Sequence, residues 1–154
     1  MTGISLIKHF QGAPGLRLFG LGPGLRPMQG LEKLQIFLEK NTFWANQRNK
    51  SQLRKMLANS SVVISLWKDK KLIGFGRATS DKIFRAVLWD VVVSNDQQGS
   101  GLGRLLVEAL LKSPCIKNAE KIYLMTTNCS EFYEQMGFNI CKEQNLLIMN
   151  KSIE

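Results

Sequence analysis

Histidine is nearly absent from this chain of 154 residues, because His9 is its single histidine. A Ser-His-Asp triad, a Cys-His pair and a zinc site with histidine ligands would each need that residue, and no partner motif lies beside it. The three cysteines, Cys115, Cys129 and Cys141, are an odd number and form no CxxC pair. They predict free thiols in a reducing compartment. We therefore expect neither histidine-based hydrolysis, nor a disulfide framework, nor a metal site.

Long apolar runs are missing as well. No stretch approaches the roughly 20 apolar residues that a membrane-spanning helix needs. The first residues, MTGISLIKHFQG, lack the apolar core of a secretory signal. We therefore expect a cytoplasmic protein that does not bind a membrane.

Acidic residues are absent before Glu32, and the segment up to Gly30 is rich in glycine and proline. Its scattered basic residues are similar to those of a transit peptide, but it has few serines and no long amphipathic pattern. We predict a Gly-rich leader over residues 1–30, with a first edge strand around Leu16–Phe19. A single folded domain is predicted over residues 31–154.

The chain carries an excess of positive charge. Lysine and arginine number 21 against 12 acidic residues, which gives a formal net charge of +9. Hydrophobic residues make up 44% of the chain, which is ordinary for a globular domain and argues against disorder. The charge predicts an anionic partner, whether a phosphate-bearing cofactor, a nucleic acid or a membrane surface.

Hydrophobic periodicity predicts the order of the elements. Helices are predicted over GLEKLQIFLEKNTFW and NKSQLRKMLANS, the second capped by Asn49 or Ser51. Three strands follow, VVISLW, KLIGFGRA and AVLWDVVV, joined by the turn KDKK and the loop ATSDKIF. A helix after QQGSGLG ends at Pro114, and KIYLMTT, SEFYEQMGF and LLIM predict a strand, a short helix and a last strand. This order is typical of an α/β fold with a mixed sheet.

The segment VVVSNDQQGSGLGR joins a buried strand to a helix through a glycine-rich turn. Such a turn lets backbone N–H groups and the positive end of the helix approach a pyrophosphate. The patterns GxGxxG and GxxxxGK[ST] both fail, because Arg104 stands where each needs a glycine. The pattern Q-x-x-G-x-G fits, with Gln98, Gly101 and Gly103 at its fixed positions. The alternative is that these glycines only allow close packing of the helix.

A second motif, FYEQMGF over Phe132–Phe138, lies about one helix and one strand downstream. Together the two motifs resemble the GNAT superfamily of acyl-CoA-dependent N-acyltransferases, with its cofactor motif [RQ]-x-x-G-x-[GA] and its FYxxxGF segment. More narrowly, FWA, SLW, GFGRATSD, FRAVLWDVVV and MTTN resemble the small cyanobacterial and plastid branch that includes serotonin N-acetyltransferase-like enzymes. The resemblance covers roughly Gly30 to the C-terminus.

The resemblance implies a single-domain GNAT-like fold, with a central twisted mixed sheet, mostly antiparallel, and helices on both faces. It implies that acetyl-CoA is the cosubstrate and that its acetyl group passes to a primary amine by direct attack on the thioester. The branch favours an arylalkylamine acceptor. A protein lysine, a polyamine or a catalytically silent acetyl-CoA-binding domain are the alternatives. A homodimer is a further expectation, and nucleic-acid binding is disfavoured because basic strands with interleaved aromatics are missing.

The resemblance also implies a cofactor site, residue by residue. Backbone groups of Val91, Val92 and Val93 would pair with the pantetheine arm. The pyrophosphate would be held by the turn and the first helical residues, namely Gln98, Gly99, Ser100, Gly101, Leu102, Gly103 and Arg104. Asn128 is a further candidate contact, since Thr126 stands where the family often has asparagine.

Tyr133, in the FYxxxGF segment, is the candidate general acid. The thiol that leaves in acetyl transfer has a pKa near ~8.5, and a phenol with a pKa near ~10 can protonate its thiolate. The alternative is an amphipathic core residue whose hydroxyl reaches the surface.

Asp90 is the candidate for the amine end of the reaction. Strict alternation along RAVLWDVVV places Leu88, Asp90 and Val92 on one face of the strand. A carboxylate among apolar residues is costly unless it is paired or functional. Asp90 would therefore take the amine proton through a water, bind the ammonium group, or pair with Arg77 or Arg85.

Phe43 and Trp44 lie at the end of the first predicted helix, where the resemblance places the acceptor site. Trp67 and Trp89 are expected in the core. Asp81 is a second candidate base, with turn capping as its alternative. A solvated helix face is predicted for the basic residues Arg48, Lys50, Arg54 and Lys55.

Overall fold

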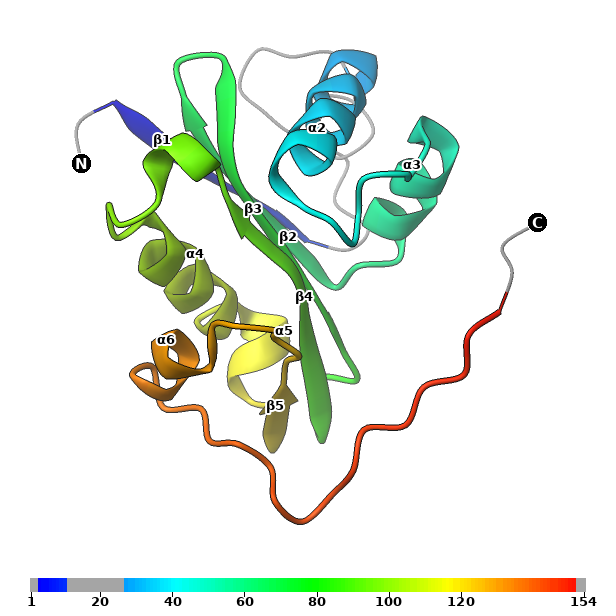
Figure 1. Cartoon of the computed structure of the whole chain (residues 1–154), viewed down its shortest axis with the longest axis vertical. Coiled ribbons are helices and arrows are strands. Elements are labelled where there is room, and N and C mark those ends of the chain that lie inside the picture. Colours follow the sequence, from blue (N-terminus) through cyan, green and yellow to red (C-terminus); the bar gives the residue numbers. More distant parts are fainter. Residues whose placement is uncertain (1–2, 11–26, 152–154) are drawn as a thin grey trace.

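A five-stranded sheet forms the centre of the computed structural model, which describes residues 3–10 and 27–151. Its strands are β1 (Ile4–Phe10), β2 (Val62–Lys68), β3 (Lys71–Ser80), β4 (Arg85–Val93) and β5 (Lys121–Tyr123). They lie side by side in this order, antiparallel from β1 to β4 and parallel between β4 and β5 (Figure 1). The expected mixed, mostly antiparallel sheet is confirmed.

Helices cover both faces of the sheet, as expected (Figure 1). One face carries α2 (Pro27–Asn41) and α3 (Lys50–Ala58), whose apolar side chains pack on the sheet around the buried Trp67 and Phe75. The other face carries α4 (Leu102–Leu111), α5 (Pro114–Lys117) and α6 (Ser130–Glu134). Buried leucines of α4 pack there against β2, β3 and β4, so the sheet separates two hydrophobic cores.

Local signals explain most of the element ends. Asn49 caps α3, because its side chain accepts the N–H of Gln52 at 2.8 Å while the Gln52 side chain accepts the N–H of Asn49 at 2.9 Å. Asp69 has a φ of 56° in the predicted turn between β2 and β3. Pro114 opens α5 after α4 has ended at Leu111.

The first edge strand lies earlier than the sequence suggests. β1 at Ile4–Phe10 pairs antiparallel with β2 along its whole length. The strand predicted around Leu16–Phe19 lies outside the described residues. Part of the predicted leader therefore belongs to the sheet, and the domain boundary at residue 31 otherwise stays a prediction.

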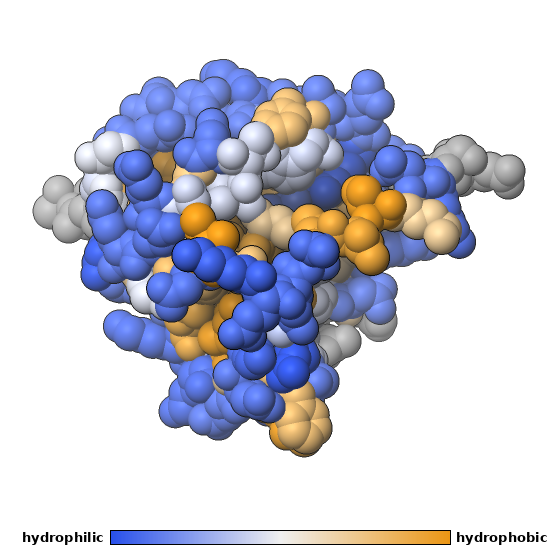
Figure 2. Space-filling model, turned by 60° about the horizontal axis from the view of Figure 1, so that its bottom comes forward, coloured by the Kyte–Doolittle hydropathy of each residue, from blue (hydrophilic) through white to orange (hydrophobic). Residues whose placement is uncertain are grey.

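The last predicted strand is absent. The run LLIM is extended but pairs with no strand among the described residues, and its four side chains are between 74% and 89% exposed. Figure 2 shows patches of hydrophobic residues within a mainly hydrophilic surface, on the face that carries this C-terminal segment. The strand predicted over KIYLMTT is confirmed only at Lys121–Tyr123. An apolar run is not enough to make a strand, because a strand also needs a neighbouring edge to pair with.

A bulge in β4 overturns the predicted alternation. Asp90 and Val91 lie opposite the single residue Gly76, since Arg77 pairs with Trp89 and Phe75 pairs with Val92. Asp90 has a φ of 52°, in the left-handed region. Leu88 therefore packs in the core beneath α4, whereas Val92 packs in the core beneath α2 and α3. The prediction that they share a face is wrong, because one extra residue inverts the side-chain order beyond it.

Candidate active site

The outer edge of β4 is open where the bulge lies. β5 pairs with β4 only between Arg85 and Val87, and no other strand of the described residues pairs with that edge further along. The backbone groups from Leu88 to Val93 on that side are therefore free to pair with an extended group. This edge includes Val91, Val92 and Val93, whose backbone groups are predicted to bind the pantetheine arm.

The glycine turn that follows β4 combines two physical demands. Gly99 and Gly101 have φ values of 79° and 83°, and a Cβ added to either would have open space around it. These two glycines thus serve the path of the chain rather than close packing. Gly103 is different, because an added Cβ would lie 3.4 Å from the ring of Phe132, at the short end of ordinary van der Waals contact. Of the three glycines, Gly103 is therefore the one that packs closely on another element, although that contact alone does not require glycine.

The first turn of α4 presents unpaired N–H groups. Gly101 caps the helix without a side-chain bond, and the first N–H to bond back is that of Leu105, to the carbonyl of Gly101 at 3.1 Å. The N–H groups of Leu102, Gly103 and Arg104 have no partner within the described part of the chain. Unpaired donors and the positive end of the helix dipole suit an anionic group such as a pyrophosphate. The donors of this turn therefore fit the phosphates of acetyl-CoA.

Side chains of the turn contribute less positive charge than the sequence suggests. The Nε of Arg104 donates to Glu108 at 2.9 Å, so the guanidinium is paired along α4. The amide of Gln98 donates to the side chain of Asn95 at 3.3 Å, within the short helix η1 (Asn95–Gln97) and its end. The hydroxyl of Ser100 donates to the carbonyl of Gln97. These bonds shape the turn, and the cofactor contacts of its residues stay predictions.

α6, which carries Tyr133, packs against the N-terminal turn of α4 through Phe132. Phe132 packs on Gly103, and the ring of Tyr133 lies edge-on to Phe132 and Phe138 at 5.0 Å and 5.8 Å. Burial, with a smaller contribution from Cys129, raises the pKa of Tyr133 to about 12. No buried side-chain oxygen of the described residues lacks a partner, and the Tyr133 hydroxyl bonds to none of them, so this hydroxyl reaches the surface. It is a neutral donor at physiological pH.

Asn128 lies on the loop before α6 and is exposed. Its side-chain oxygen accepts the thiol of Cys129 at 3.3 Å, and the N–H of Cys129 donates to Thr126 at 3.1 Å. The role of Asn128 as a cofactor contact stays a prediction.

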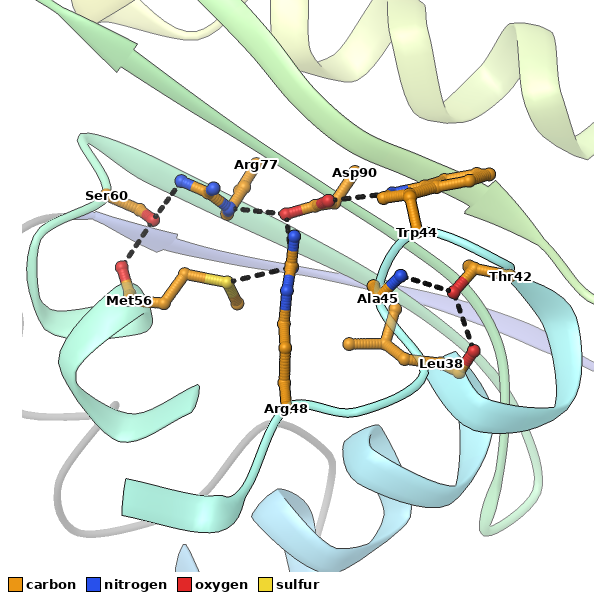
Figure 3. A network of polar contacts seen from close by, with 9 residues as sticks. All are labelled: Leu38, Thr42, Trp44, Ala45, Arg48, Met56, Ser60, Arg77 and Asp90. Atoms are coloured by element: carbon orange, nitrogen blue, oxygen red, sulfur yellow. Dashed lines mark hydrogen bonds and ion pairs between the residues drawn. The ribbon is translucent and has the colours of Figure 1, made fainter. Parts of the chain in front are cut away.

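Asp90 is the centre of a polar network that joins β4 to the segment between α2 and α3 (Figure 3). Trp44 donates its Nε1–H to Oδ1 at 3.0 Å. Arg48 and Arg77 both donate to Oδ2, at 2.9 Å and 2.8 Å. The carboxylate side chain is only 4% exposed.

Two cations determine the protonation state of Asp90. Burial raises the pKa of this carboxyl, but the hydrogen bonds and charges of Arg48 and Arg77 outweigh it and hold the pKa below its ordinary value. Arg77 is the partner that the sequence suggested, whereas Arg85 pairs with Glu120 at 3.4 Å. The geometry therefore favours the paired carboxylate among the roles considered for Asp90.

The low pKa of Asp90 predicts an acid-sensitive fold. A carboxyl whose pKa is lower in the folded chain contributes its full stability above its unfolded pKa of about 3.9 and loses it as the pH falls through the folded pKa. We expect Asp90→Asn to lower the free energy of unfolding by about 3 kcal/mol at pH 7, because it leaves two arginines without their buried partner. That difference should shrink below about pH 4. Urea unfolding at pH 7, 4 and 3 measures it, and parallel pH curves for the two proteins would contradict the assignment.

The structure brings Phe43 and Trp44 to the same region. Their rings meet edge-on at 5.1 Å and are 70% and 48% exposed. The last residue of α2, Asn41, accepts the N–H of Asn95 at 2.9 Å, which ties this segment to the chain entering the glycine turn. Phe43 and Trp44, the residues predicted to bind the acceptor, thus lie next to the segment predicted to bind the cofactor.

Other sequence predictions have clear outcomes. Trp67 is buried in the core as expected, and Trp89 is half-buried with its Nε1–H donating to Thr79 at 2.9 Å. Asp81 accepts three backbone N–H groups of its own loop, which confirms turn capping and lowers its pKa. The prediction of a solvated helix face is wrong for Arg48, which precedes α3 and binds Asp90.

An open strand edge that runs into a helix N-terminus with unpaired N–H groups is the arrangement expected of a protein that takes an extended, phosphate-bearing ligand. Residues 28–146 match the family described as acetyltransferase (GNAT) domain. The chain therefore belongs to the GNAT acetyltransferase family, as its motifs suggested.

Similar proteins support this membership. The chain is 41% identical over 87 residues to a protein of Pyropia yezoensis named "Uncharacterized N-acetyltransferase ycf52", covering 53% of this chain and 50% of that protein. It is 38% identical over 104 residues to "Histone acetyltransferase TAP1" of Glycine max, covering 60% and 45%. The chain spans about half the length of the curated relatives it matches.

The fold recurs in a solved structure. The GNAT family acetyltransferase SP0256 from Streptococcus pneumoniae TIGR4 superposes with a TM-score of 0.70 at 19% identity, covering 97% of this chain and 99% of that one. This likeness concerns the fold alone.

Within the described ranges, no helix is long and apolar enough to cross a membrane. The same residues contain no group of three or more histidine, cysteine or acidic side chains that could hold a metal ion. The cytoplasmic location and the absence of a metal stay predictions.

Proposed function

We propose that this chain transfers the acetyl group of acetyl-CoA to a primary amine. The observation that carries the proposal is the open edge of β4 running directly into the unpaired N–H groups at the start of α4. Acetyl-CoA supplies the activated acetyl thioester. The edge from Val91 to Val93 binds the pantetheine arm, and the turn from Gln98 to Arg104 binds the pyrophosphate.

Tyr133 acts as the general acid in this proposal. Its neutral hydroxyl, on the helix α6 that packs on α4 through Phe132, donates a proton to the departing sulfur. The amine must be neutral to attack the thioester. Its excess proton leaves through water, because the Asp90 carboxylate is already paired with Arg48 and Arg77. No residue of the chain is assigned as a dedicated base.

An arylalkylamine is the proposed acceptor. The exposed pair Phe43 and Trp44 offers aromatic surface next to the cofactor edge. The net charge of +9 disfavours polyamines by long-range repulsion. A protein lysine is the second candidate, favoured by the name of the soybean relative, which is a histone acetyltransferase.

CoA release from acetyl-CoA, measured against tryptamine, serotonin, tyramine, spermidine and a lysine-containing peptide, tests this proposal. We expect release with the three aromatic amines to exceed release with spermidine at least about tenfold. CoA release with the peptide and with none of the other amines would identify protein lysines as the acceptor class. Acetyl-CoA binding without release from any amine would contradict acetyl transfer and favour a silent acetyl-CoA-binding domain.

A further inference from the structure

We propose that Asp90 is a positioning residue that holds the segment between α2 and α3, residues 42–49, against β4. In this role it places Phe43 and Trp44 at the acceptor end of the cofactor edge and takes no proton from the amine. The inference rests on the proposed acetyl transfer, and it deepens it by naming what defines the acceptor subsite. We call residues 42–49 the acceptor loop.

Both carboxylate oxygens of Asp90 are already bonded to side chains of the protein. Oδ1 accepts from Trp44, and Oδ2 accepts from Arg48 and Arg77. A general base needs a free lone pair within reach of the proton that it removes. With 4% of the side chain exposed and two guanidinium groups on one oxygen, Asp90 has little capacity left for that proton.

The acceptor loop is anchored at its start as well. Thr42 donates its hydroxyl to the carbonyl of Leu38 at 2.8 Å and accepts the N–H of Ala45 at 3.1 Å (Figure 3). Ala45 is buried, so the loop turns inward between the exposed Phe43 and Trp44 pair and Arg48. Beyond this anchor, Asp90 is the partner that ties both Trp44 and Arg48 to the sheet.

The bulge connects this anchoring to the cofactor edge. Asp90 adopts a left-handed backbone, which costs energy for any residue with a Cβ and is tolerated best by aspartate and asparagine among the non-glycine residues. The extra residue turns the carboxylate toward the acceptor loop and leaves Val91 to Val93 at the open edge. The bulge thus positions both the acceptor loop and the strand edge that binds the cofactor.

The charges of the network indicate the kind of acceptor. Arg48 and Arg77 outnumber Asp90, so the network keeps a net positive charge. A second ammonium group on the acceptor is therefore disfavoured there, and the exposed rings of Phe43 and Trp44 favour an aromatic group.

Two substitutions test the positioning role. Trp44→Phe keeps an aromatic ring but loses the bond to Oδ1, and Asp90→Asn keeps the shape and the left-handed preference but loses the charge. We expect each to raise the KM for the acceptor about tenfold, to change kcat less than about threefold, and to leave the acid limb of the kcat pH profile in place. Acetyl-CoA affinity, measured by calorimetry, should not change.

The chain offers a matched control. Asp69→Asn makes the same charge change at another left-handed aspartate, in the turn between β2 and β3. We expect it to leave the acceptor KM unaltered. A fall in kcat of about a hundredfold in Asp90→Asn, with loss of the acid limb of the pH profile, would overturn the proposal in favour of a base.

Limited trypsin cleavage after Arg48 gives a readout that needs no activity. Freed from its carboxylate partner in Asp90→Asn, Arg48 should be cleaved about tenfold faster than in the wild type and in Asp69→Asn. Unchanged cleavage would overturn the positioning role even if acetyl transfer is established. Faster cleavage in a protein that releases no CoA would overturn the proposed function and leave the anchoring of the loop intact.

Discussion

Tyr133→Phe is expected to lower kcat by about 10²–10⁴-fold while leaving the affinity for acetyl-CoA unchanged. The substitution removes one hydroxyl and keeps the ring that packs against Phe132 and Phe138. Since that hydroxyl bonds to no other described residue, the fold loses no hydrogen bond. Stopped assays of CoA release at saturating acceptor, together with calorimetry of acetyl-CoA binding, measure the two effects.

A control variant and the pH dependence test this prediction further. Tyr123→Phe is the matched control, because Tyr123 is the only other tyrosine of the chain, and it should retain wild-type kcat. With the pKa of Tyr133 raised to about 12, the phenol stays protonated through the neutral range, so its own deprotonation should not reduce the rate until the pH approaches that value. A Tyr133→Phe enzyme within about threefold of wild type would assign proton donation to another group.

The helices and the strands β2, β3 and β4 could be predicted because their signals are local. The apolar spacing over Leu31–Leu38 and the capping residue Asn49 lie within single elements, and the structure places α2 and α3 there. The glycine turn is equally local, since Gly99 and Gly101 mark positive φ values that the strand-to-helix path requires.

What the sequence could not reveal depends on contacts between distant residues. Arg48 lies 42 residues from Asp90 in the chain, and no spacing rule links them. The bulge at Asp90 has no glycine in its own strand to mark it, so alternation alone placed Leu88 and Val92 on one face, whereas they pack in different cores. The missing strand at Leu146–Met149 has a similar cause, because an apolar run does not state whether a partner edge exists.

Gly101→Val is expected to weaken acetyl-CoA binding about 10- to 100-fold. A β-branched residue is a genuine outlier at a φ of 83°, so the turn must change its path to relieve the strain. The space around Gly101 is open, and the loss therefore comes from backbone geometry and not from a clash. A changed path withdraws the N–H groups of Leu102 and Gly103 from the pyrophosphate.

Gly3→Val separates the effect on binding from the effect on stability. Gly3 has a φ of 81° and equally open surroundings, but it precedes β1 rather than α4. Both variants should lose about 1–2 kcal/mol of unfolding free energy, since the backbone strain is the same. Only Gly101→Val should raise the dissociation constant of acetyl-CoA in calorimetry, and equal affinities for the two variants would remove the glycine turn from the cofactor site. Because a tenfold change corresponds to about 1.4 kcal/mol of binding free energy, the expected difference lies well within what calorimetry resolves.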